Sequence, residues 1–336
     1  MTQKEIQEIK GILSEPKKIS IIHHKNADGD AIGSSMALNS YLNICGHKSN
    51  VISPNKFPEF LKWLDNKNQI IIFNNSSQAT KLINDSDMIF TLDFNSLDRC
   101  GDMKDLISKS KAIKILIDHH ENPKKYANYT YSDTKISSTC EMIYNFIGKL
   151  GDNDKINSSI AEAIYTGIMT DTGSFRFSST SSLTHKVISD LLEKGANKSK
   201  IHNEIYDNNR IEKIKLLSFA LSKIEIMPDY NTAFISLSQK ELNKFDFRKG
   251  DTEGIVNYGL SIRKIKFAAI FIEDIKENIT KISFRSKGNF DVNKFSRDIF
   301  NGGGHKNASG AISRDSLSST IINFKNALKK YKSDLN

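Results

Sequence analysis

Histidine and aspartate residues that could bind a metal ion gather in one short stretch near the N-terminus. His24 ends an apolar, β-branched run, and Asp28 and Asp30 follow it four and six residues later around a glycine. The pattern predicts a strand, a loop and a helix, and ligands bind at such loops in open α/β sheets. Imidazole and carboxylate ligands together suit Mn²⁺, Mg²⁺ or Zn²⁺. For this stretch alone, an Asp-Gly turn beside an incidental histidine explains the pattern equally well.

The same residue types recur at the ends of two later apolar runs. One run is followed by Asp93, and the next is followed by Asp118, His119 and His120. A single aspartate at such a position could cap a helix, and a single histidine could lie on the surface. Three such groups at successive strand ends, on the same edge of a sheet, favour a metal site instead.

Asp171 is a further acidic candidate. It follows the helix expected over 159–170 and begins the sequence Asp-Thr-Gly-Ser-Phe. The local pattern by itself favours a turn that leaves a helix. The assignment of Asp171 therefore depends on the rest of the chain.

The elements that must position these residues follow from the apolar runs. Short apolar runs alternate with polar, helix-like segments, and this βαβ alternation predicts a parallel sheet. The helix expected over 31–41 is rich in small residues, which suits close packing on a sheet. The expected strands are the run ending at His24 and residues 51–52, 69–73, 88–92 and 113–117.

The length of 336 residues suits two domains rather than one core. We expect an N-terminal domain over 1–195, a helical connector over 196–215 and a smaller domain over 216–336. The expected strands of the smaller domain are 232–237, 266–272 and 279–285, and its expected helices are 239–244, 252–260 and 292–300. The fold class is therefore α/β with two lobes, a parallel-sheet domain followed by a compact α+β domain.

Charge is distributed unevenly along the chain. The net charge is +9, of which residues 216–336 carry +7 and residues 1–215 carry +2. The C-terminal domain should therefore prefer anionic partners. A lysine-rich surface supports nucleic-acid binding only weakly by itself, and it gains weight beside a metal site.

The cysteines and the apolar runs argue against several classes of protein. Cys45, Cys100 and Cys140 are scattered and lack CxxC spacing, which argues against a disulfide framework and against a cysteine zinc site. The first ten residues contain no apolar signal core, and no apolar run is long enough to span a bilayer. We therefore expect a cytoplasmic protein with no membrane partner and with reduced, structural cysteines.

Glycines accumulate beside a histidine near the C-terminus. Gly302, Gly303 and Gly304 precede His305 and Lys306. Glycines let backbone N–H groups approach a ligand closely, and the adjacent side chains supply positive charge, so the run is typical of an anion cradle. A flexible loop is the alternative.

These motifs resemble those of the DHH phosphoesterase family, and in particular its oligoribonuclease (nanoRNase) and 3′-phosphoadenosine-5′-phosphate (pAp) phosphatase subgroup. The resemblance covers nearly the whole chain. The first motif matches residues 24–33, with Ala27 where the family has proline, and Asn301 stands where a fourth glycine is common. The other matching residues are Asp93; Asp118, His119 and His120, followed by Asn122 and Pro123; residues 171–175; and Phe284, Arg285 and Ser286.

The resemblance implies a centre of two divalent metal ions, most often manganese, with magnesium as the alternative. The two sets of ligands would share Asp93, which would bridge the ions. The sets are His24, Asp28 and Asp93 for one ion, and Asp30, Asp93, His119 and Asp171 for the other.

The resemblance also implies roles in catalysis and substrate binding. Asp118 would orient a ligating imidazole, and His120 would face the scissile phosphate. The second lobe would close over the first, leaving an active-site cleft between them, and would grip one end of the substrate. The residues expected to bind substrate are Arg285, Ser286, Gly302, Gly303, Gly304 and His305.

The implied activity is hydrolysis of phosphate esters by water that two cations activate. The expected substrates are very short RNA or DNA oligonucleotides, cleaved to mononucleotides, and nucleotide phosphates such as pAp. The nearest alternative is a phosphodiesterase for cyclic dinucleotides or their linear products. A non-catalytic nucleotide sensor is disfavoured because every ligand position is filled. Homodimers are the family expectation.

Overall fold

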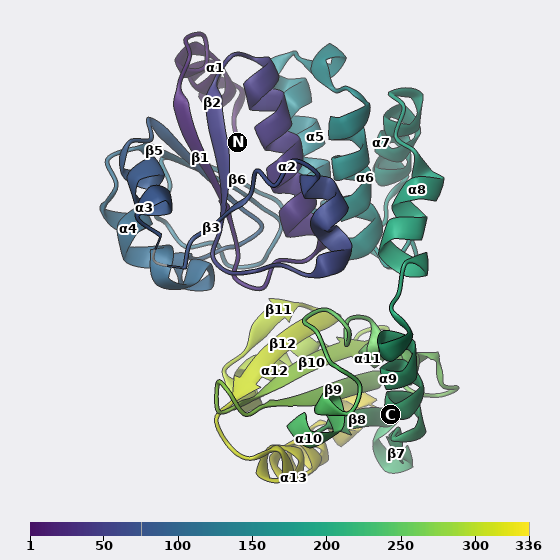
Figure 1. Ribbon diagram of the computed structural model, residues 1–336. Coiled ribbons are helices and arrows are strands. Elements are labelled where there is room, and N and C mark those ends of the chain that lie inside the picture. The colour runs from purple at the N-terminus through teal and green to yellow at the C-terminus, as the bar shows by residue number, and fades with distance from the viewer. Residues whose placement is uncertain (75, 336) are drawn as a thin grey trace. The chain divides into compact units, whose positions relative to one another are not determined.

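The computed structural model describes residues 1–74 and 76–335, which form two compact units (Figure 1). Unit 1 spans Met1–Asn208 and unit 2 spans Asn209–Asn336. The boundary falls within the segment 196–215 in which we expected the connector. This segment contains the helix α8 (Lys198–His202), a π-helical turn (Asn203–Asp207) and the beginning of α9 (Ile211–Ser222).

Unit 1 is built on a six-stranded parallel sheet, which confirms the prediction from βαβ alternation. The chain runs from the centre of the sheet to one edge and then returns to the other side of the first strand. The strand order therefore reverses between β1 and β4, where ligands bind in sheets of this kind. In spatial order the strands are β3 (Ile71–Ile72), β2 (Lys48–Ser53), β1 (Lys18–His23), β4 (Met88–Leu92), β5 (Ile113–Asp118) and β6 (Tyr129–Ser132).

The register aligns the ends of the three central strands. His23 of β1 pairs with Leu92 of β4, and Leu92 pairs with Ile117 of β5. The next residue of each strand is His24, Asp93 and Asp118, respectively. These three residues therefore lie at the same level on the same edge of the sheet.

Helices cover both faces of the sheet of unit 1, and successive strand residues point to opposite faces (Figure 1). Ile21 belongs to the core under the first group of helices, whereas its neighbour Ile22 belongs to the core under the second group. The first group comprises α1 (Gln3–Ile12), α2 (Gly29–Ile44), α5 (Thr139–Leu150), α6 (Ser158–Asp171) and α7 (Ser182–Glu193). The second group comprises α3 (Ser77–Asn84) and α4 (Lys104–Lys109).

Small residues let α2, α5 and α6 pack closely on one another, whereas the composition of the segment 31–41 predicted close packing on a sheet. A Cβ atom on Gly33 would lie 2.6 Å from the backbone oxygen of Ala163, and one on Gly167 would overlap the side chain of Cys140. Side chains larger than hydrogen would therefore push these helices apart. The close packing brings the beginning of α2, the beginning of α5 and the end of α6 toward one another.

Unit 2 contains a mixed six-stranded sheet with helices, which confirms the expected α+β domain. Strands β8 and β9 are parallel, and the other neighbours are antiparallel. In spatial order the strands are β11 (Gly303–His305), β12 (Ala308–Ser313), β10 (Ile279–Ser286), β9 (Phe267–Asp274), β8 (Thr232–Leu237) and β7 (Glu225–Met227). The helices that follow α9 are α10 (Gln239–Asn243), α11 (Ile255–Ser261), α12 (Val292–Phe300), α13 (Leu317–Leu328) and α14 (Lys332–Leu335).

Phenylalanine side chains fill the core of unit 2. Phe267 lies at its centre and contacts Phe284, Phe295 and Phe324 with ring centroids 5.0–5.7 Å apart. These rings are fully buried, so they supply much of the apolar area that this small unit removes from water.

Among the helices of residues 1–74 and 76–335, none is both long and apolar enough to cross a lipid bilayer.

Candidate metal centre

Asp93 lies between two histidines that come from different strand ends of unit 1. Its Oδ2 atom is 3.3 Å from Nε2 of His24, and its Oδ1 atom is 3.6 Å from Nε2 of His119. The Asp93 carboxylate is 2% exposed. Each oxygen of one buried carboxylate therefore faces a separate imidazole, as the proposed bridging role requires.

The first cluster of possible ligands comprises His24, Asp28 and Asp93. Nε2 of His24 also lies 3.8 Å from Oδ1 of Asp28. Asp28 caps α2, because its side chain accepts hydrogen bonds from the N–H groups of Asp30 and Ala31 at 3.1 Å. The start of a helix thus holds the carboxylate beside the strand-end histidine.

The second cluster comprises Asp30, His119 and Asp171. Nε2 of His119 lies 3.8 Å from Oδ2 of Asp30 and 3.5 Å from Oδ2 of Asp171. The structure thus brings the end of α6 to the strand end of β5, and Asp171 lies with the other acidic candidates rather than in an isolated turn. The six residues predicted to bind metal all lie in these two clusters.

The start of α5 supports both clusters, and the sequence patterns did not reveal this. Asp30 accepts hydrogen bonds from the backbone N–H groups of Thr139 at 2.7 Å and Cys140 at 2.8 Å. The Thr139 hydroxyl donates to Oδ1 of Asp93 at 3.0 Å. The only local signal was the expected cap of this helix at Ser137 or Ser138, and Ser138 is the cap.

Asp118 contacts the imidazole of His120. Its Oδ1 atom lies 2.7 Å from Nδ1 of His120, which we predicted to face the phosphate. Nδ1 of the predicted ligand His119 instead lies 3.3 Å from the backbone oxygen of Ile136. The two rings follow each other in the chain and lie at 76° to each other. That Asp118 orients a ligating imidazole stays a prediction.

Asp93, Asp118 and His120 form a third group whose ligand atoms converge. Nδ1 of His120 lies 3.7 Å from Oδ1 of Asp93, in addition to its contact with Asp118. His120 thus adjoins the shared carboxylate. His23, to which we assigned no role, is buried and its Nδ1 lies 3.0 Å from the backbone oxygen of His24.

Two backbone segments at the site adopt the left-handed conformation that non-glycine residues rarely use. Asp93 has φ of 62°, and Gly173, Ser174 and Phe175 after Asp171 have φ of 56°, 57° and 66°. Such strain clusters at functional sites, where the surrounding structure must hold it. Here it turns the chain sharply at two of the predicted ligands.

Buried charges shift the pKa values of the clustered groups. Burial lowers the pKa of His24, but the Asp28 and Asp93 carboxylates outweigh it and raise the pKa to about 10. Burial likewise opposes the carboxylates around His119, which raise its pKa to about 9. Burial and the neighbouring carboxylates of Asp93 and Asp171 raise the pKa of Asp30 well above its usual range. These carboxylates therefore require positive charge nearby.

The residues fit a metal ion. The Nε2 atom of His24 is buried and has no hydrogen-bond partner within residues 1–74 and 76–335, although two carboxylates face it. Separations of 3.3–3.8 Å are too long for strong hydrogen bonds. These separations suit atoms that bind one shared cation. Two ligand atoms that each lie about 2.1 Å from an ion, at right angles to each other, are about 3 Å apart. Oxygen and imidazole donors without thiolate favour manganese or magnesium.

The residues predicted to bind substrate lie on two neighbouring parts of the sheet of unit 2. Arg285 and Ser286 end β10, and Gly303, Gly304 and His305 form the edge strand β11 rather than an open loop. A Cβ atom on Gly302 would overlap the Ser296 side chain and the Gly310 backbone, whereas one on Gly303 would meet open space.

Ser286 has a supporting contact of its own. Its hydroxyl donates to the backbone oxygen of Phe290 at 2.6 Å and accepts from Nδ2 of Asn307 at 2.8 Å. Ser286 is buried, and these bonds tie β10 to the hairpin of β11 and β12. Its predicted contact with substrate stays a prediction.

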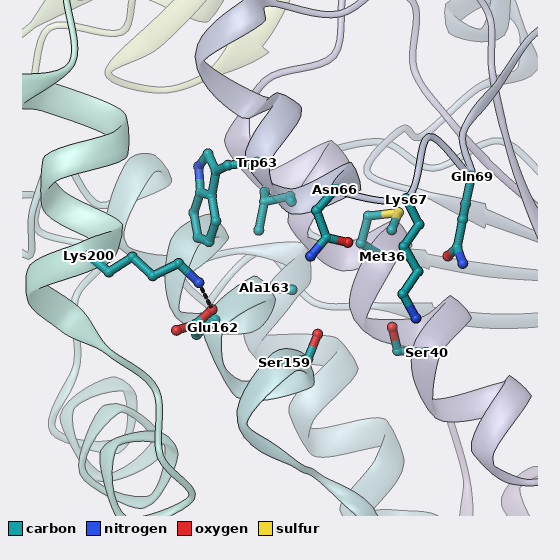
Figure 2. Close-up of a pocket in the computed structure, with 11 residues that line it drawn as sticks. Met36, Ser40, Trp63, Asn66, Lys67, Gln69, Ser159, Glu162, Ala163 and Lys200 are labelled. Carbon is teal, nitrogen blue, oxygen red and sulfur yellow. Dashed lines mark hydrogen bonds and ion pairs between the residues drawn. The ribbon is translucent and has the colours of Figure 1, made fainter.

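A cavity of unit 1 lies elsewhere, between α2, α6, α8 and the 3₁₀ helix η1 (Glu59–Asp65). It has a volume of about 110 Å³ and contains none of the predicted site residues. Figure 2 shows Lys200, Glu162 and Trp63 among the residues that line this cavity. The Lys200 ammonium group lies 2.7 Å from the Glu162 carboxylate and 5.2 Å from the centroid of the Trp63 ring. The predicted chemistry therefore belongs to the strand ends and not to this cavity.

Comparison with known proteins identifies the family. Residues 18–168 match the DHH family, N-terminal domain, and residues 231–335 match the DHHA1 domain. A crystal structure of an exopolyphosphatase-related protein from Bacteroides fragilis is 40% identical with a TM-score of 0.93, covering 99% of this chain and 98% of that one. The chain belongs to the DHH phosphoesterase family.

This DHH phosphoesterase also resembles characterised bacterial enzymes at lower identity. It is 29% identical over 296 residues to the bifunctional oligoribonuclease and PAP phosphatase NrnA of Bacillus subtilis (strain 168), covering 87% of this chain and 88% of that protein. RecJ of Thermus thermophilus, solved in complex with Mn²⁺, is 11% identical with a TM-score of 0.50, and the match covers 100% of this chain and 56% of RecJ. At that identity the likeness to RecJ is one of fold.

Proposed function

We propose that this DHH phosphoesterase uses two manganese ions to hydrolyse very short oligonucleotides to mononucleotides and pAp to AMP. The observation that carries the proposal is the position of Asp93, whose two oxygens face His24 at 3.3 Å and His119 at 3.6 Å. Two cations that share one carboxylate lie close enough together to act on one phosphate. The substrate class is suggested by the name of the Bacillus subtilis relative.

The ligand sets follow the two clusters. His24, Asp28 and Asp93 would hold one ion, and the second set would be Asp30, Asp93, His119 and Asp171. When bound, the cations would lower the pKa of a water molecule and neutralise charge on the phosphate. Manganese is preferred over magnesium because both sets contain an imidazole, and the fold neighbour RecJ was solved with Mn²⁺.

His120 and Asp118 would act on the substrate rather than on the ions. The hydrogen bond of 2.7 Å to Asp118 holds Nδ1 of His120, and Nε2 would be the ring atom that exchanges a proton with the phosphate ester. Asp118 fixes the ring orientation and stabilises the ring when it is protonated. This pairing resembles the way a buried carboxylate orients a catalytic histidine in hydrolases.

Unit 2 would supply substrate recognition. Residues 216–336, all within this unit, carry +7 of the net charge, and Arg285 and His305 belong to strands that lie on either side of β12. A guanidinium suits the phosphate of a nucleotide, because it can donate two parallel hydrogen bonds. The N–H groups around Gly303, where a Cβ would meet open space, could contact the same anion.

A second candidate is hydrolysis of inorganic polyphosphate. It is favoured by the similarity of 40% to the exopolyphosphatase-related protein of Bacteroides fragilis. Both candidates use the same metal ligands and differ in what the second unit must bind. Cyclic dinucleotides and their linear products remain the third substrate class.

The experiment compares substrates on one enzyme preparation. Purified protein is incubated with pAp, RNA of two to five nucleotides, a linear polyphosphate and a cyclic dinucleotide, with Mn²⁺ or with excess chelator, and products are separated by length. We expect Mn²⁺-dependent release of mononucleotides and AMP, and no activity in an Asp93→Ala variant. Turnover of polyphosphate alone would replace the proposal with the second candidate. Binding of nucleotides without turnover of any substrate would favour a sensor.

A further inference from the structure

Arg99 lies against the residue that follows the first predicted metal ligand. It belongs to the 3₁₀ helix η2 (Leu97–Met103), which begins shortly after Asp93. The backbone N–H of Lys25 donates a hydrogen bond of 2.7 Å to the backbone oxygen of Arg99. A Cβ atom on Gly101 would lie only 3.5 Å from the Lys25 side chain, so η2 packs against the β1 loop at this point.

The side chain of Arg99 is half-buried. Within residues 1–74 and 76–335, its guanidinium makes neither a hydrogen bond nor an ion pair. Two other basic side chains do form ion pairs. Lys104 in the adjacent helix pairs with Asp98, and Arg210 of unit 2 pairs with Asp251 at 2.8 Å. A half-buried arginine without a partner is uncommon, because burial of an unpaired charge is costly.

The charge of Arg99 acts on one side of the metal centre. It lowers the pKa of His120, after burial, and it lowers the pKa of both His24 and Asp28 among weaker causes. Because η2 contacts Lys25, the residue that follows His24, Arg99 belongs to the His24 side of the metal centre.

Charge balance indicates which kind of ligand would suit the metal centre together with Arg99. The ligand sets contain the carboxylates of Asp28, Asp30, Asp93 and Asp171. Two divalent cations would neutralise these four carboxylates, and the Arg99 guanidinium would then leave the centre positive. A phosphodiester, which carries one negative charge, would offset that charge, and the flat guanidinium fits two phosphate oxygens at once.

We propose that Arg99 is a catalytic residue that binds the non-bridging oxygens of the reacting phosphate, on the same side as His120. The role of Arg99 rests on the proposed function in one respect, which is that the reacting group is a phosphate. The proposal assigns the guanidinium to the transition state, in which the entering hydroxide has brought negative charge to the phosphoryl group and the leaving ester oxygen has not yet carried that charge away. It does not depend on the base, the sugar or the length of the substrate.

The test compares Arg99→Ala and Arg99→Lys with Lys104→Ala as the matched control. Lys104→Ala removes the same charge from the next helix of the same segment, at a side chain that is 53% exposed and paired with Asp98. Each variant is assayed with bis(p-nitrophenyl) phosphate, which is small, and with a dinucleotide. Manganese content, the thermal unfolding midpoint and the affinity of the Mg²⁺-loaded protein for inorganic phosphate are measured in parallel.

We expect Arg99→Ala to lower kcat/KM about 100-fold on both esters with manganese content unchanged. Phosphate affinity should fall in the same variant, and added guanidinium chloride should restore part of its activity. Arg99→Lys should lose less, because an ammonium keeps the charge but not the two parallel hydrogen bonds. Lys104→Ala should stay within about twofold of the wild type and should not respond to guanidinium.

Three outcomes would overturn the proposal. They are an Arg99→Ala variant with normal phosphate affinity, one with depleted manganese, and one whose loss of activity is matched by Lys104→Ala. The phosphate titration separates this inference from the proposed function. If the wild type cleaves neither oligonucleotides nor pAp while Arg99→Ala loses phosphate affinity, the substrate assignment fails and the role of Arg99 stands.

Discussion

The Oδ1 atom of Asp118 lies 2.7 Å from Nδ1 of His120, and both side chains are buried where β5 ends. Replacing Asp118 with asparagine keeps the shape but removes the charge that holds the ring. We expect kcat to fall about 10- to 100-fold, the usual cost of losing the partner of an active-site imidazole, with manganese content preserved. Metal analysis and steady-state kinetics check this. Loss of one manganese ion per chain would instead make Asp118 a ligand, as its convergence with Asp93 and His120 would allow.

The neighbouring histidines should separate metal binding from catalysis. Nε2 of His119 lies 3.5 Å from Asp171 and 3.6 Å from Asp93, so His119→Ala should deplete manganese. His120→Ala should keep its manganese and lose turnover by about 10²- to 10³-fold on every substrate, because one donor to the transition state is removed. Metal content of both variants, measured after gel filtration, decides the assignment. Full manganese in His119→Ala with depletion in His120→Ala would reverse the two roles.

The hydroxyl of Thr139 should strengthen manganese binding by the shared carboxylate of Asp93. This hydroxyl donates to Oδ1 of Asp93, which is the oxygen that faces His119. Thr139→Val removes this bond and retains the backbone N–H that supports Asp30. We expect manganese affinity to fall about 10-fold, mainly at the His119 site.

Thr166→Val is the matched control for Thr139→Val. Thr166 is also buried, but among residues 1–74 and 76–335 its hydroxyl bonds only to the backbone oxygen of Glu162 in its own helix. Calorimetric titration with Mn²⁺ should distinguish the two variants. Equal affinities in both would show that the Thr139 hydroxyl does not act through Asp93.

The stability of the chelated protein should fall as the pH rises above neutrality. Folding raises the pKa of His24 to about 10 and that of His119 to about 9, from ordinary values near 6.5. The folded state then holds protons that the unfolded state has released, so the stabilisation is complete below about pH 6.5 and is lost through about pH 9–10. Each imidazole contributes a slope of about 1.4 kcal/mol per pH unit between these limits.

Urea unfolding at several pH values, with chelator and with saturating Mn²⁺, tests this dependence. A His24→Gln variant should show a shallower slope in chelator. Saturating Mn²⁺ should remove the slope, because a metal-bound imidazole carries no proton on the ligating atom. A flat free energy of unfolding between about pH 7 and pH 10 in chelator would contradict the charged state assigned to these histidines.

The charged residues of unit 2 should affect recognition and not the ions. Arg285 and His305 lie outside the unit that contains every proposed metal ligand. Arg285→Ala and His305→Ala should weaken cleavage of a dinucleotide by about one to two powers of ten, the value of a charge-assisted hydrogen bond. Part of the loss can fall in kcat, because distant binding energy also orients the reacting phosphate.

A small ester supplies the control for these two variants. Bis(p-nitrophenyl) phosphate lacks the far end of a nucleotide, so its turnover and the manganese content should stay near wild type. Equal losses on both substrates would place Arg285 and His305 in the catalytic centre. The division of roles between the two units would then have to be abandoned.

The sequence by itself determined where the metal-binding residue types stand on the fold. Parallel strands in a βαβ chain end on one edge, so the apolar runs before His24, Asp93 and Asp118 predicted that these residues meet. The mixed sheet of unit 2 was also predictable in outline. Its edge strand at Gly303–His305 was not, because only the pairing with β12 converts the glycine run into a strand.

The tertiary structure alone decided which partners each site residue has. Asp171 joins His119, Thr139 supports Asp93 across 46 positions, and Cys140 supports Asp30 across 110 positions. Asp118 lies within hydrogen-bond distance of His120, and the backbone oxygen of Arg99 accepts a hydrogen bond from Lys25 in the first motif. Sequence periodicity reports how a segment lies on its own strand or helix. Contacts between distant segments depend on strand order, register and helix packing, which arise only when the whole chain is folded.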